Sequence, residues 1–404
     1  MKIGFVSGGY LPAPGGVATS VVNFSKQLEG LGHKVFVFCP DYPEEEIETE
    51  DPQTVIRIPS YYSPLLKDFR LTDPFQAAGT FRKFFEKLDI VHVHLPTIMS
   101  LPARWLASYY DVPLFFTYHT NLELYIRHYV PGIPSNASRA VSRFYTYRET
   151  KNGEKMFVPS TDMKDLLEQY NLDLPLEVLP SGIDIDMYME RAKTVKEKLE
   201  RSLREQFGID DSEKILLYVG RVGSEKNVEF LLKAFDLIAK ECPGAHFVIV
   251  GGGRGLGKIL ALVSKLHQSR RVHFTGYVED ERALAGYYSE ADLFLFASLT
   301  ETQGLVVAEA MASSTPVVAV DAPGVRDVLH GGQGGYLVDM DLQEFSRKAI
   351  RLLKDGDLLR KKGEEALEVA KSFSVQRFTE QMLNSYEEAI ERKKGSGGPE
   401  PVKR

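Results

Sequence analysis

The feature that most constrains the fold is an alternation of short apolar runs with segments of helical periodicity. Ile3–Val6 is predicted to be a strand, and Val17, Val21, Phe24 and Leu28 follow it at the three- and four-residue spacing of a helix that faces a core. Strands that are apolar along their whole length are typical of parallel sheets covered by helices on both faces. The chain is therefore predicted to have an α/β fold.

The alternation occurs twice, which predicts two doubly wound parallel-sheet domains facing each other across a cleft. In the first series, further strands are expected at Val35–Phe38, Val55–Ile58, Ile90–Val93, Leu114–Thr117 and Met156–Val158. The second series follows a pause around residue 180, with strands expected at Ile215–Val219, Phe247–Val250, Val272–Thr275, Leu293–Phe296 and Val317–Val320. A length of 404 residues suits two domains of ordinary size.

The pause around residue 180 predicts a first domain at 1–180 and a second domain at 181–374. A helix at about 375–392 is expected to pack back on the first domain. The tail at 394–404 consists of turn-forming and charged residues and is expected to be disordered.

Composition excludes several classes of protein. Cys39 and Cys242 are far apart and have no metal-ligand spacing, which argues against a disulfide scaffold or a zinc cluster and fits a reducing cytoplasm. The first residues do not have the pattern of a signal peptide, and no apolar run reaches the roughly 20 residues of a spanning helix. We expect a cytoplasmic protein with no nucleic-acid partner, attached at most peripherally to the inner face of the cell membrane.

The stretch from 52 to 160 is basic although the whole chain has a net charge of −7. It contains 13 Lys and Arg against 8 Asp and Glu, a net charge of +5. It is also rich in aromatic residues, namely Tyr61, Tyr62, Phe69, Phe75, Phe81, Phe84, Phe85, Trp105, Tyr109 and Tyr110. Basic and aromatic residues on one surface suit an anionic bilayer. The alternative, an aromatic core below an ordinary charged surface, stays open from the sequence alone.

The strongest candidate site follows the predicted strand at Leu293–Phe296. The segment after it reads ASLTETQGLVVAEAM, with a loop at 302–304 and a helix predicted at Leu305–Met311. The start of a helix offers free N–H groups and a positive dipole end, which suits a diphosphate. Glu301 precedes this start and Glu309 lies inside the helix, and carboxylates accept hydrogen bonds from sugar and ribose hydroxyls. By itself the spacing of the two glutamates is weak evidence, because exposed helix charges are common.

Arg221 and Lys226 follow the predicted strand Ile215–Val219 in the segment GRVGSEKN. Cations at the carboxyl edge of a parallel sheet can neutralise a leaving diphosphate. The alternative without a binding role is that Ser224 is a helix cap and Lys226 a solvated helix residue. We favour the functional role.

Two weaker candidates lie in the first domain. Pro14-Gly15-Gly16 precedes a predicted helix and resembles a phosphate loop without its lysine. His119 directly follows the strand Leu114–Thr117, so it is expected at the carboxyl edge as well. In the second domain, the run Gly251-Gly252-Gly253-Arg254 permits close backbone approach to a ligand, and it is equally compatible with a tight turn.

No metal site is predicted. His92 and His94 alternate on one strand face, but no third ligand accompanies them. Three Asp-x-Asp pairs are interpreted as caps or turns, where Asp is favoured, namely Asp184 with Asp186, Asp339 with Asp341, and Asp355 with Asp357.

Taken together, the motifs resemble glycosyltransferase family 4. The resemblance rests on GRVGSEKN, on Glu301 with Glu309, on GYV at Gly276–Val278 and on the PGGV loop, and it covers nearly the whole chain. VATS at Val17–Ser20, YHTNLELYIRHYV from 118 to 130 and TETQGL at 300–305 look most like bacterial 1,2-diacylglycerol 3-alpha-glucosyltransferases. The run GGGRG and the segment from Asn121 to Leu124 depart from the common pattern.

The resemblance implies a GT-B fold and retaining transfer of glucose from UDP-glucose to diacylglycerol in an anionic membrane. Arg221 and Lys226 would bind the diphosphate, and Glu309 the ribose. Glu301 with the backbone of Gln303, Gly304 and Leu305 would hold the donor sugar and its phosphates. Gly16 would approach the distal phosphate and His119 the transferred sugar, while the base would rest near Tyr277 and Val278. No cofactor is required, and Mg²⁺ is at most an aid.

The mechanism that the resemblance implies is front-face displacement, in which a phosphate oxygen takes the proton of the acceptor hydroxyl. Alternatives within the transferases are a GDP-mannose enzyme acting on phosphatidylinositol and a transferase for a soluble sugar acceptor. Alternatives of other classes are a UDP-sugar 2-epimerase of the same architecture and a non-catalytic sugar-binding protein.

Overall fold

The computed structural model describes residues 1–12, 15–43, 54–62, 70–94, 97–130, 132–193 and 202–395. The chain divides into two compact units. Unit 1 consists of Met1–Gly182 and Val375–Arg404, and unit 2 of Ile183–Ser374. The expected boundary at 180/181 lies two residues before this one. Of the tail expected at 394–404, residues 396–404 lie outside the described part of the chain, and the first two residues end the last helix.

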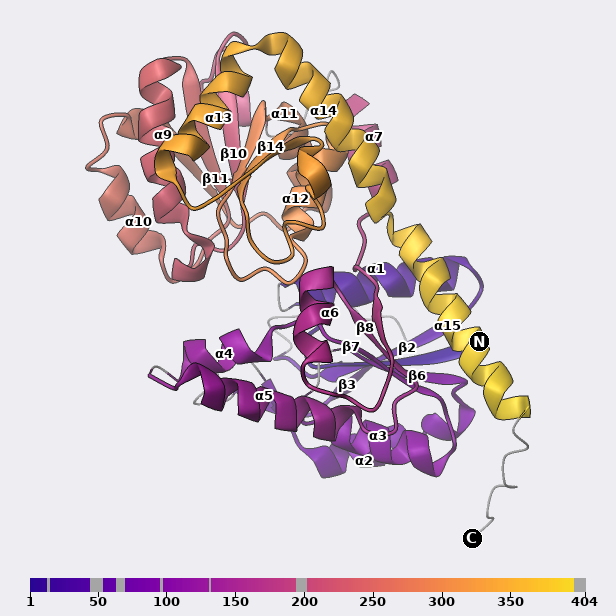
Figure 1. The fold of residues 1–404 in the computed structure, drawn as a ribbon. Coiled ribbons are helices and arrows are strands. Elements are labelled where there is room, and N and C mark those ends of the chain that lie inside the picture. Colours follow the sequence, from indigo (N-terminus) through magenta and orange to yellow (C-terminus); the bar gives the residue numbers. More distant parts are fainter. Residues whose placement is uncertain are drawn as a thin grey trace. The chain divides into compact units, whose positions relative to one another are not determined.

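A seven-stranded sheet forms the centre of unit 1 (Figure 1), with the order β3-β2-β1-β6-β7-β8-β9. All neighbouring strands are parallel. The strands are β1 (Lys2–Ser7), β2 (Lys34–Pro40), β3 (Val55–Ile58), β6 (Ile90–His94), β7 (Leu114–Thr117), β8 (Lys155–Val158) and β9 (Leu176–Val178). All but β9 were expected. A short antiparallel pair, β4 (Ser60–Tyr62) and β5 (Arg70–Thr72), was also not expected.

Helices cover both faces of this sheet, as the apolar strands require. They are α1 (Gly16–Gly30), α2 (Pro74–Arg82), α3 (Ser100–Tyr109), α4 (Leu122–Tyr129), α5 (Ser135–Thr150), α6 (Thr161–Glu168) and α15 (Val375–Gly395). One face packs Val91, Val93 and Phe116 against α2, α3 and α6. On the other face, the ring of Tyr386 from α15 lies against Phe115 and His92. The C-terminal helix therefore belongs to the core of unit 1 although it follows unit 2 in the chain.

Unit 2 has a six-stranded parallel sheet with the order β12-β11-β10-β13-β14-β15. Its strands are β10 (Lys214–Val219), β11 (Ala245–Val250), β12 (Val272–Gly276), β13 (Leu293–Phe296), β14 (Val317–Val320) and β15 (Gly335–Val338). In both units the first strand lies at the point where the order reverses. Open α/β sheets bind ligands at this switch point, beyond the carboxyl ends of the strands.

The helices of unit 2 surround its sheet (Figure 1). They are α7 (Ile185–Lys193), α8 (Leu203–Phe207), α9 (Val228–Glu241), α10 (Leu256–Val263), α11 (Glu281–Glu290), α12 (Leu305–Ala312), α13 (Leu342–Lys354) and α14 (Gly356–Ala370). Asp341 and Asp355 accept hydrogen bonds from N–H groups at the starts of α13 and α14, and Asp184 accepts one from Met187 N. These aspartates are helix caps, as the sequence suggested.

None of the helices in the described ranges is both long and apolar enough to cross a bilayer.

Candidate functional site

The carboxyl edge of unit 2 brings Lys226 and Glu301 together. Lys226 ends a short 3₁₀ turn at Ser224–Lys226 after β10, and Glu301 follows the neighbouring strand β13. The Lys226 ammonium is paired with Oε1 of Glu301, and both side chains are more than four-fifths buried. Two residues that are 75 positions apart in the chain therefore form one charged pair at the switch point.

Hydrogen bonds from side chains to backbone carbonyls hold the two loops that carry this pair. The side-chain amide of Asn227 donates to the carbonyl of Ala297, 2.9 Å away, and so joins the loop after β10 to the loop after β13. Asn227 has a left-handed backbone with φ of 52°, which asparagine adopts more readily than most residues. The hydroxyl of Tyr218 donates to the carbonyl of Arg221, 2.9 Å away.

Arg221 itself does not join the buried pair. Its side chain is 72% exposed and lies 3.4 Å from Glu225. The edge thus offers a buried cation that is held in place by Glu301 and an exposed cation that pairs with Glu225 at the surface.

The glycine-rich run after β11 packs against this loop. A Cβ on Gly251 would lie 2.1 Å from the carbonyl oxygen of Gly220, and a Cβ on Gly253 would lie 2.7 Å from that of Val222. Val222 N also donates to Gly252 O at 2.8 Å. The structure gives Gly251 and Gly253 a backbone-packing role that was not among the two interpretations from the sequence. Their lack of side chains lets β11 and the Arg221 loop approach each other.

The loop before α12 is fixed by a second glycine contact. Gly304 has φ of 66° at the start of the helix, and Gln303 is buried. A Cβ on Gly324 would lie 2.6 Å from Gln303 N and 2.9 Å from Glu301 O, so the loop after β14 supports the Glu301 backbone. Because Leu305 begins the helix, its first N–H groups have no partner within the helix and can bind an anion.

Glu309 lies inside α12 and contacts a tyrosine, Tyr288, that the sequence did not point to. The hydroxyl of Tyr288, from α11, donates to Oε2 of Glu309 at 2.8 Å. The ring of Tyr188, from α7, lies edge-on to Tyr288 at 6.1 Å. Burial raises the pKa of the Glu309 carboxyl to about 7, against the hydrogen bond from Tyr288, which lowers it.

Tyr277 and Val278 follow β12, the edge strand of the same sheet. The Tyr277 side chain is 60% exposed, and Val278 is half-buried. An exposed aromatic ring and a neighbouring apolar residue at the carboxyl edge suit a planar base.

The predicted residues of unit 1 also lie at its carboxyl edge. Gly16 begins α1 after β1, and a Cβ added to it would meet no atom within 4 Å, so the backbone there is open to a ligand. Pro14 of the same loop lies outside the described residues. His119 comes two residues after the end of β7, and its Nε2 lies 3.2 Å from Nδ1 of His94. Burial lowers the pKa of His119 to about 4.

The histidines on β6 form hydrogen bonds with protein side chains. His92 contacts the hydroxyls of Tyr386 and Thr117 at 2.5 and 2.7 Å. In the described part of the chain, no three His, Cys, Asp or Glu side chains are grouped as metal ligands would be.

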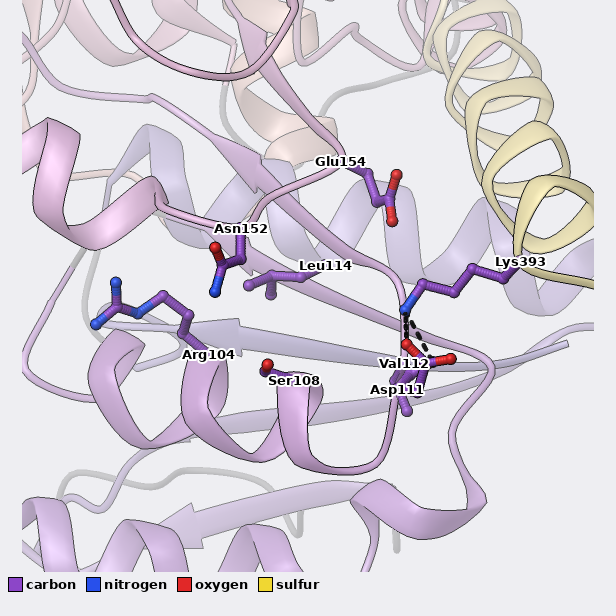
Figure 2. A pocket seen from close by; sticks show the side chains of 8 residues that line it. All are labelled: Arg104, Ser108, Asp111, Val112, Leu114, Asn152, Glu154 and Lys393. Carbon is purple, nitrogen blue, oxygen red and sulfur yellow. Dashed lines mark hydrogen bonds and ion pairs between the residues drawn. The ribbon is translucent and has the colours of Figure 1, made fainter. Parts of the chain in front are cut away.

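A cavity of about 210 Å³ lies at the opposite edge of the unit 1 sheet (Figure 2). It is lined by Arg104, Ser108, Asp111, Val112, Leu114, Asn152, Glu154 and Lys393. Residues 111–113 and 152–154 precede β7 and β8, and Leu114 begins β7, so the cavity is at the amino ends of the strands. Lys393 is paired with Asp111 at 2.5 Å, and the lining has charges of both signs. The cavity is separate from the predicted site residues.

Comparison with known proteins identifies the family. Residues 14–187 match the family model described as Glycosyltransferase Family 4, and residues 200–369 match that of glycosyl transferases group 1. The chain is 33% identical over 342 residues to the alpha-monoglucosyldiacylglycerol synthase of Streptococcus pneumoniae, covering 83% of this chain and 75% of that protein. It is 31% identical over 366 residues to the protein of the same name from Acholeplasma laidlawii, covering 89% and 90%.

More distant relatives extend these matches. One is a GDP-mannose-dependent alpha-mannosyltransferase of Mycolicibacterium smegmatis, 29% identical with 84% of this chain and 85% of that protein covered. Among solved structures, sucrose-phosphate synthase from Thermosynechococcus elongatus superposes with a TM-score of 0.79 at 21% identity, covering 97% and 99%. Anabaena HepE in complex with UDP and glucose gives 0.73 at 18%, covering 96% and 99%. These structural matches show the GT-B fold.

The sequence matches, which cover most of the chain, and the two-sheet architecture agree. The chain is a glycosyltransferase and belongs to glycosyltransferase family 4.

Proposed function

We propose that this glycosyltransferase moves glucose from UDP-glucose to diacylglycerol, with retention of configuration at the anomeric carbon. The observation that carries the proposal is the likeness to two proteins named alpha-monoglucosyldiacylglycerol synthase, each above 30% identity over more than four-fifths of the chain. The donor and acceptor assignments below rest on that likeness and on the geometry of each unit.

In unit 2 the donor is bound at the carboxyl edge. Arg221 and Lys226 hold the diphosphate, and Glu301 positions the donor sugar. The N–H groups at the start of α12 add further donors to the phosphates. The backbone of Gln303, Gly304 and Leu305 helps to hold the donor sugar and its phosphates. Glu309 binds the ribose, and the base rests near Tyr277 and Val278.

In unit 1, Gly16 allows the distal phosphate to approach the backbone at the start of α1. His119 contacts a hydroxyl of the transferred sugar. Since burial keeps His119 uncharged at neutral pH, its ring offers hydrogen bonds and no charge.

The transfer step depends on the positive charges that lie beside the leaving diphosphate. The acceptor hydroxyl attacks on the face that the nucleotide leaves, and a phosphate oxygen takes the proton. Lys226 and Arg221 stabilise the negative charge that develops on the diphosphate. Glu301 does not serve as a nucleophile in this scheme, because its carboxylate is engaged by Lys226.

The lipid acceptor requires a surface that meets the bilayer, and α5 provides one. Its buried residues are all polar, namely Ser138, Ser142, Thr146, Glu149 and Thr150. Its outer side exposes Val141, Phe144 and Tyr147 by 51%, 67% and 41%, together with Arg139, Arg143 and Arg148. A helix of a soluble protein normally buries its apolar residues instead. We call the outer side, with its three apolar and three arginine residues, the α5 face.

Helix α3, which contacts α5, also exposes aromatic residues. Arg104 on α3 donates to the carbonyl of Arg148. Trp105 and Tyr109 of α3 are 54% and 62% exposed and stack on each other. Apolar and aromatic side chains among arginines suit an anionic lipid surface.

The aromatic residues of the 52–160 stretch are divided between the two interpretations that the sequence left open. Phe81 and Phe85 are in the core, whereas Phe75, Trp105 and Tyr109 are exposed. Phe69 lies outside the described residues.

A donor-by-acceptor assay tests the proposal. The purified chain is incubated with UDP-glucose or GDP-mannose and with vesicles that contain diacylglycerol, phosphatidylinositol or neither. We expect a glucosylated lipid that retains the α configuration only with UDP-glucose and diacylglycerol. Mannosyl transfer to phosphatidylinositol, transfer to a soluble sugar, or epimerisation of UDP-glucose without acceptor would each replace this proposal with the corresponding alternative.

A further inference from the structure

Three histidines form a row at the carboxyl edge of unit 1. His92 and His94 lie on the same face of β6, with ring centroids 4.2 Å apart. His119, beyond the end of β7, stacks on His94 with centroids 5.4 Å apart and ring planes 18° apart. The row therefore runs from the interior of the sheet to the residue that contacts the transferred sugar in the proposed function.

The inner part of the row is fully enclosed. His92 and His94 have no exposed surface, and the ring of Phe5 lies 4.5 Å from that of His94. Burial lowers the pKa of His92 and His94 well below the usual range. All three rings are therefore neutral at neutral pH, and each has one N–H donor and one bare nitrogen acceptor.

The contact between His94 and His119 involves a single proton. Nδ1 of His94 lies 3.2 Å from Nε2 of His119, so one of these two nitrogens donates to the other. If His119 donated, the proton of His94 would be on Nε2, a buried atom with no hydrogen-bond partner among the described residues. A buried N–H without an acceptor is rarer in proteins than an unused acceptor. The arrangement with fewer penalties has His94 donating from Nδ1.

We propose that His94 is a positioning residue that sets the tautomer and ring plane of His119. With Nε2 accepting from His94, His119 carries its proton on Nδ1. His119 then acts toward the transferred sugar as a hydrogen-bond donor and does not take the proton of the acceptor hydroxyl. The role of His119 toward the sugar rests on the proposed function, whereas its tautomer does not.

The test compares His94→Asn with His94→Gln in the full chain. The amide nitrogen of Asn occupies nearly the place of Nδ1 and can donate to His119, whereas that of Gln reaches the place of Nε2. Selective ¹⁵N labelling of histidine reports which ring nitrogens are protonated, without any donor or acceptor present. A His119→Asn variant assigns the signals, and His267→Asn, whose native side chain is 77% exposed, is the matched control.

We expect the wild-type spectrum to show His119 protonated on Nδ1. His94→Asn keeps this pattern, and His94→Gln loses it. Loss of one aligned hydrogen bond corresponds to a fall in kcat of about tenfold for His94→Gln. KM for UDP-glucose changes less than about twofold, since the pair acts through orientation, and His267→Asn leaves kcat unchanged.

Two results would overturn the proposal. One is a wild-type His119 that carries its proton on Nε2. The other is a His94→Gln protein whose His119 signals stay unchanged, whether or not its stability falls, because that shows a merely structural role. If His94→Gln does not fold, the wild-type spectrum alone decides. If the chain transfers no glucose to diacylglycerol, the spectra still test the tautomer, so the two failures are distinguishable.

Discussion

At the scale of single residues, the pairing of Lys226 with Glu301 makes each side chain depend on the other. Both are more than four-fifths buried, so removing one leaves the other with little water to solvate it. In the proposed function, the same pairing holds the ammonium at the switch point before the diphosphate arrives, which reduces the reorganisation needed during reaction.

We therefore expect Lys226→Ala and Glu301→Ala each to lower kcat by about 10²- to 10³-fold. Each is expected to lower the free energy of unfolding by about 1–3 kcal/mol and to leave the fold intact. Transfer rates and urea unfolding measure the two effects. Lys233→Ala, which breaks an exposed pair with Glu229, is the control and should change neither. Near-normal transfer by either purified site variant would show that the pair does not serve the reaction.

Glu309 is a residue whose charge opposes folding. Its pKa is raised to about 7 in the folded chain, above the ordinary value of 4.5. Between these two values the folded state binds more protons than the unfolded state, so stability falls as the pH rises from about 4.5 to 7. In the proposed function, however, an ionised Glu309 is the better acceptor for the ribose hydroxyls.

Glu309→Gln should remove this part of the pH dependence. We expect the variant to be more stable than the wild type at pH 8 by about 2 kcal/mol, allowing for partial exposure, and to have no such advantage at pH 4.5. Urea midpoints measured across this range test the sign. The same variant should bind UDP more weakly at pH 8. An equal difference in stability at both pH values would contradict the raised pKa.

At the scale of elements, α5 departs from the usual pattern of an amphipathic helix. Ser138, Ser142 and Thr146 are buried against the protein, whereas Val141, Phe144 and Tyr147 are exposed among arginines. This inversion has no benefit for the folding of unit 1, since Val141 and Phe144 lose little water on folding. It is explained if the α5 face meets a second apolar phase.

Phe144→Ser is expected to lower binding to vesicles of anionic lipid by about tenfold, because the ring no longer enters the interface. Arg143→Gln should weaken binding about fivefold to anionic vesicles and hardly at all to neutral ones. Both should leave the free energy of unfolding within about 0.5 kcal/mol of the wild type. Co-sedimentation measures binding, and Leu260→Ser on α10, an exposed apolar residue of unit 2, is the control. Unchanged sedimentation of Phe144→Ser would remove the α5 face from the proposal.

At the scale of the whole molecule, each unit has its own sheet and core, and unit 1 is completed by the C-terminal helix. The buried hydroxyl of Tyr386 on α15 lies 2.5 Å from Nδ1 of His92 on β6, 294 positions earlier. In unit 2, the hydroxyl of Thr315 donates to the carbonyl of Tyr288 at 2.6 Å. Each contact belongs to one unit only.

Calorimetry should therefore show that a substitution in one unit shifts the unfolding transition of that unit alone. Tyr386→Phe leaves a buried imidazole nitrogen without its partner, which costs about 1–3 kcal/mol. It should lower the transition of unit 1 by roughly 2–4 °C per kcal/mol and leave that of unit 2 in place. Thr315→Val should lower the transition of unit 2 and leave that of unit 1 in place. If either variant shifts both transitions equally, the units do not unfold independently.

The strands show how far the sequence alone could be read. Eleven strands were expected and all appear, within two residues at each end, because their apolar runs are local signals. The strands that were not expected are short edge strands or hairpin strands. β9 has three half-buried residues, and β15 follows a cluster of glycines. Such strands gain their stability from a neighbour and leave only a weak pattern in their own residues.

The sequence by itself determined that the candidate residues follow strands, and hence that they gather at the carboxyl edges of two sheets. Only the tertiary structure decided the partners: Lys226 with Glu301, Tyr288 with Glu309, His94 with His119, and the glycines of β11 with the Arg221 loop. Burial affects every residue of a strand or helix, so the apolar residues of that element follow a regular pattern in the sequence. Partner choice depends on strand order and on contacts between distant segments, and no local pattern records it.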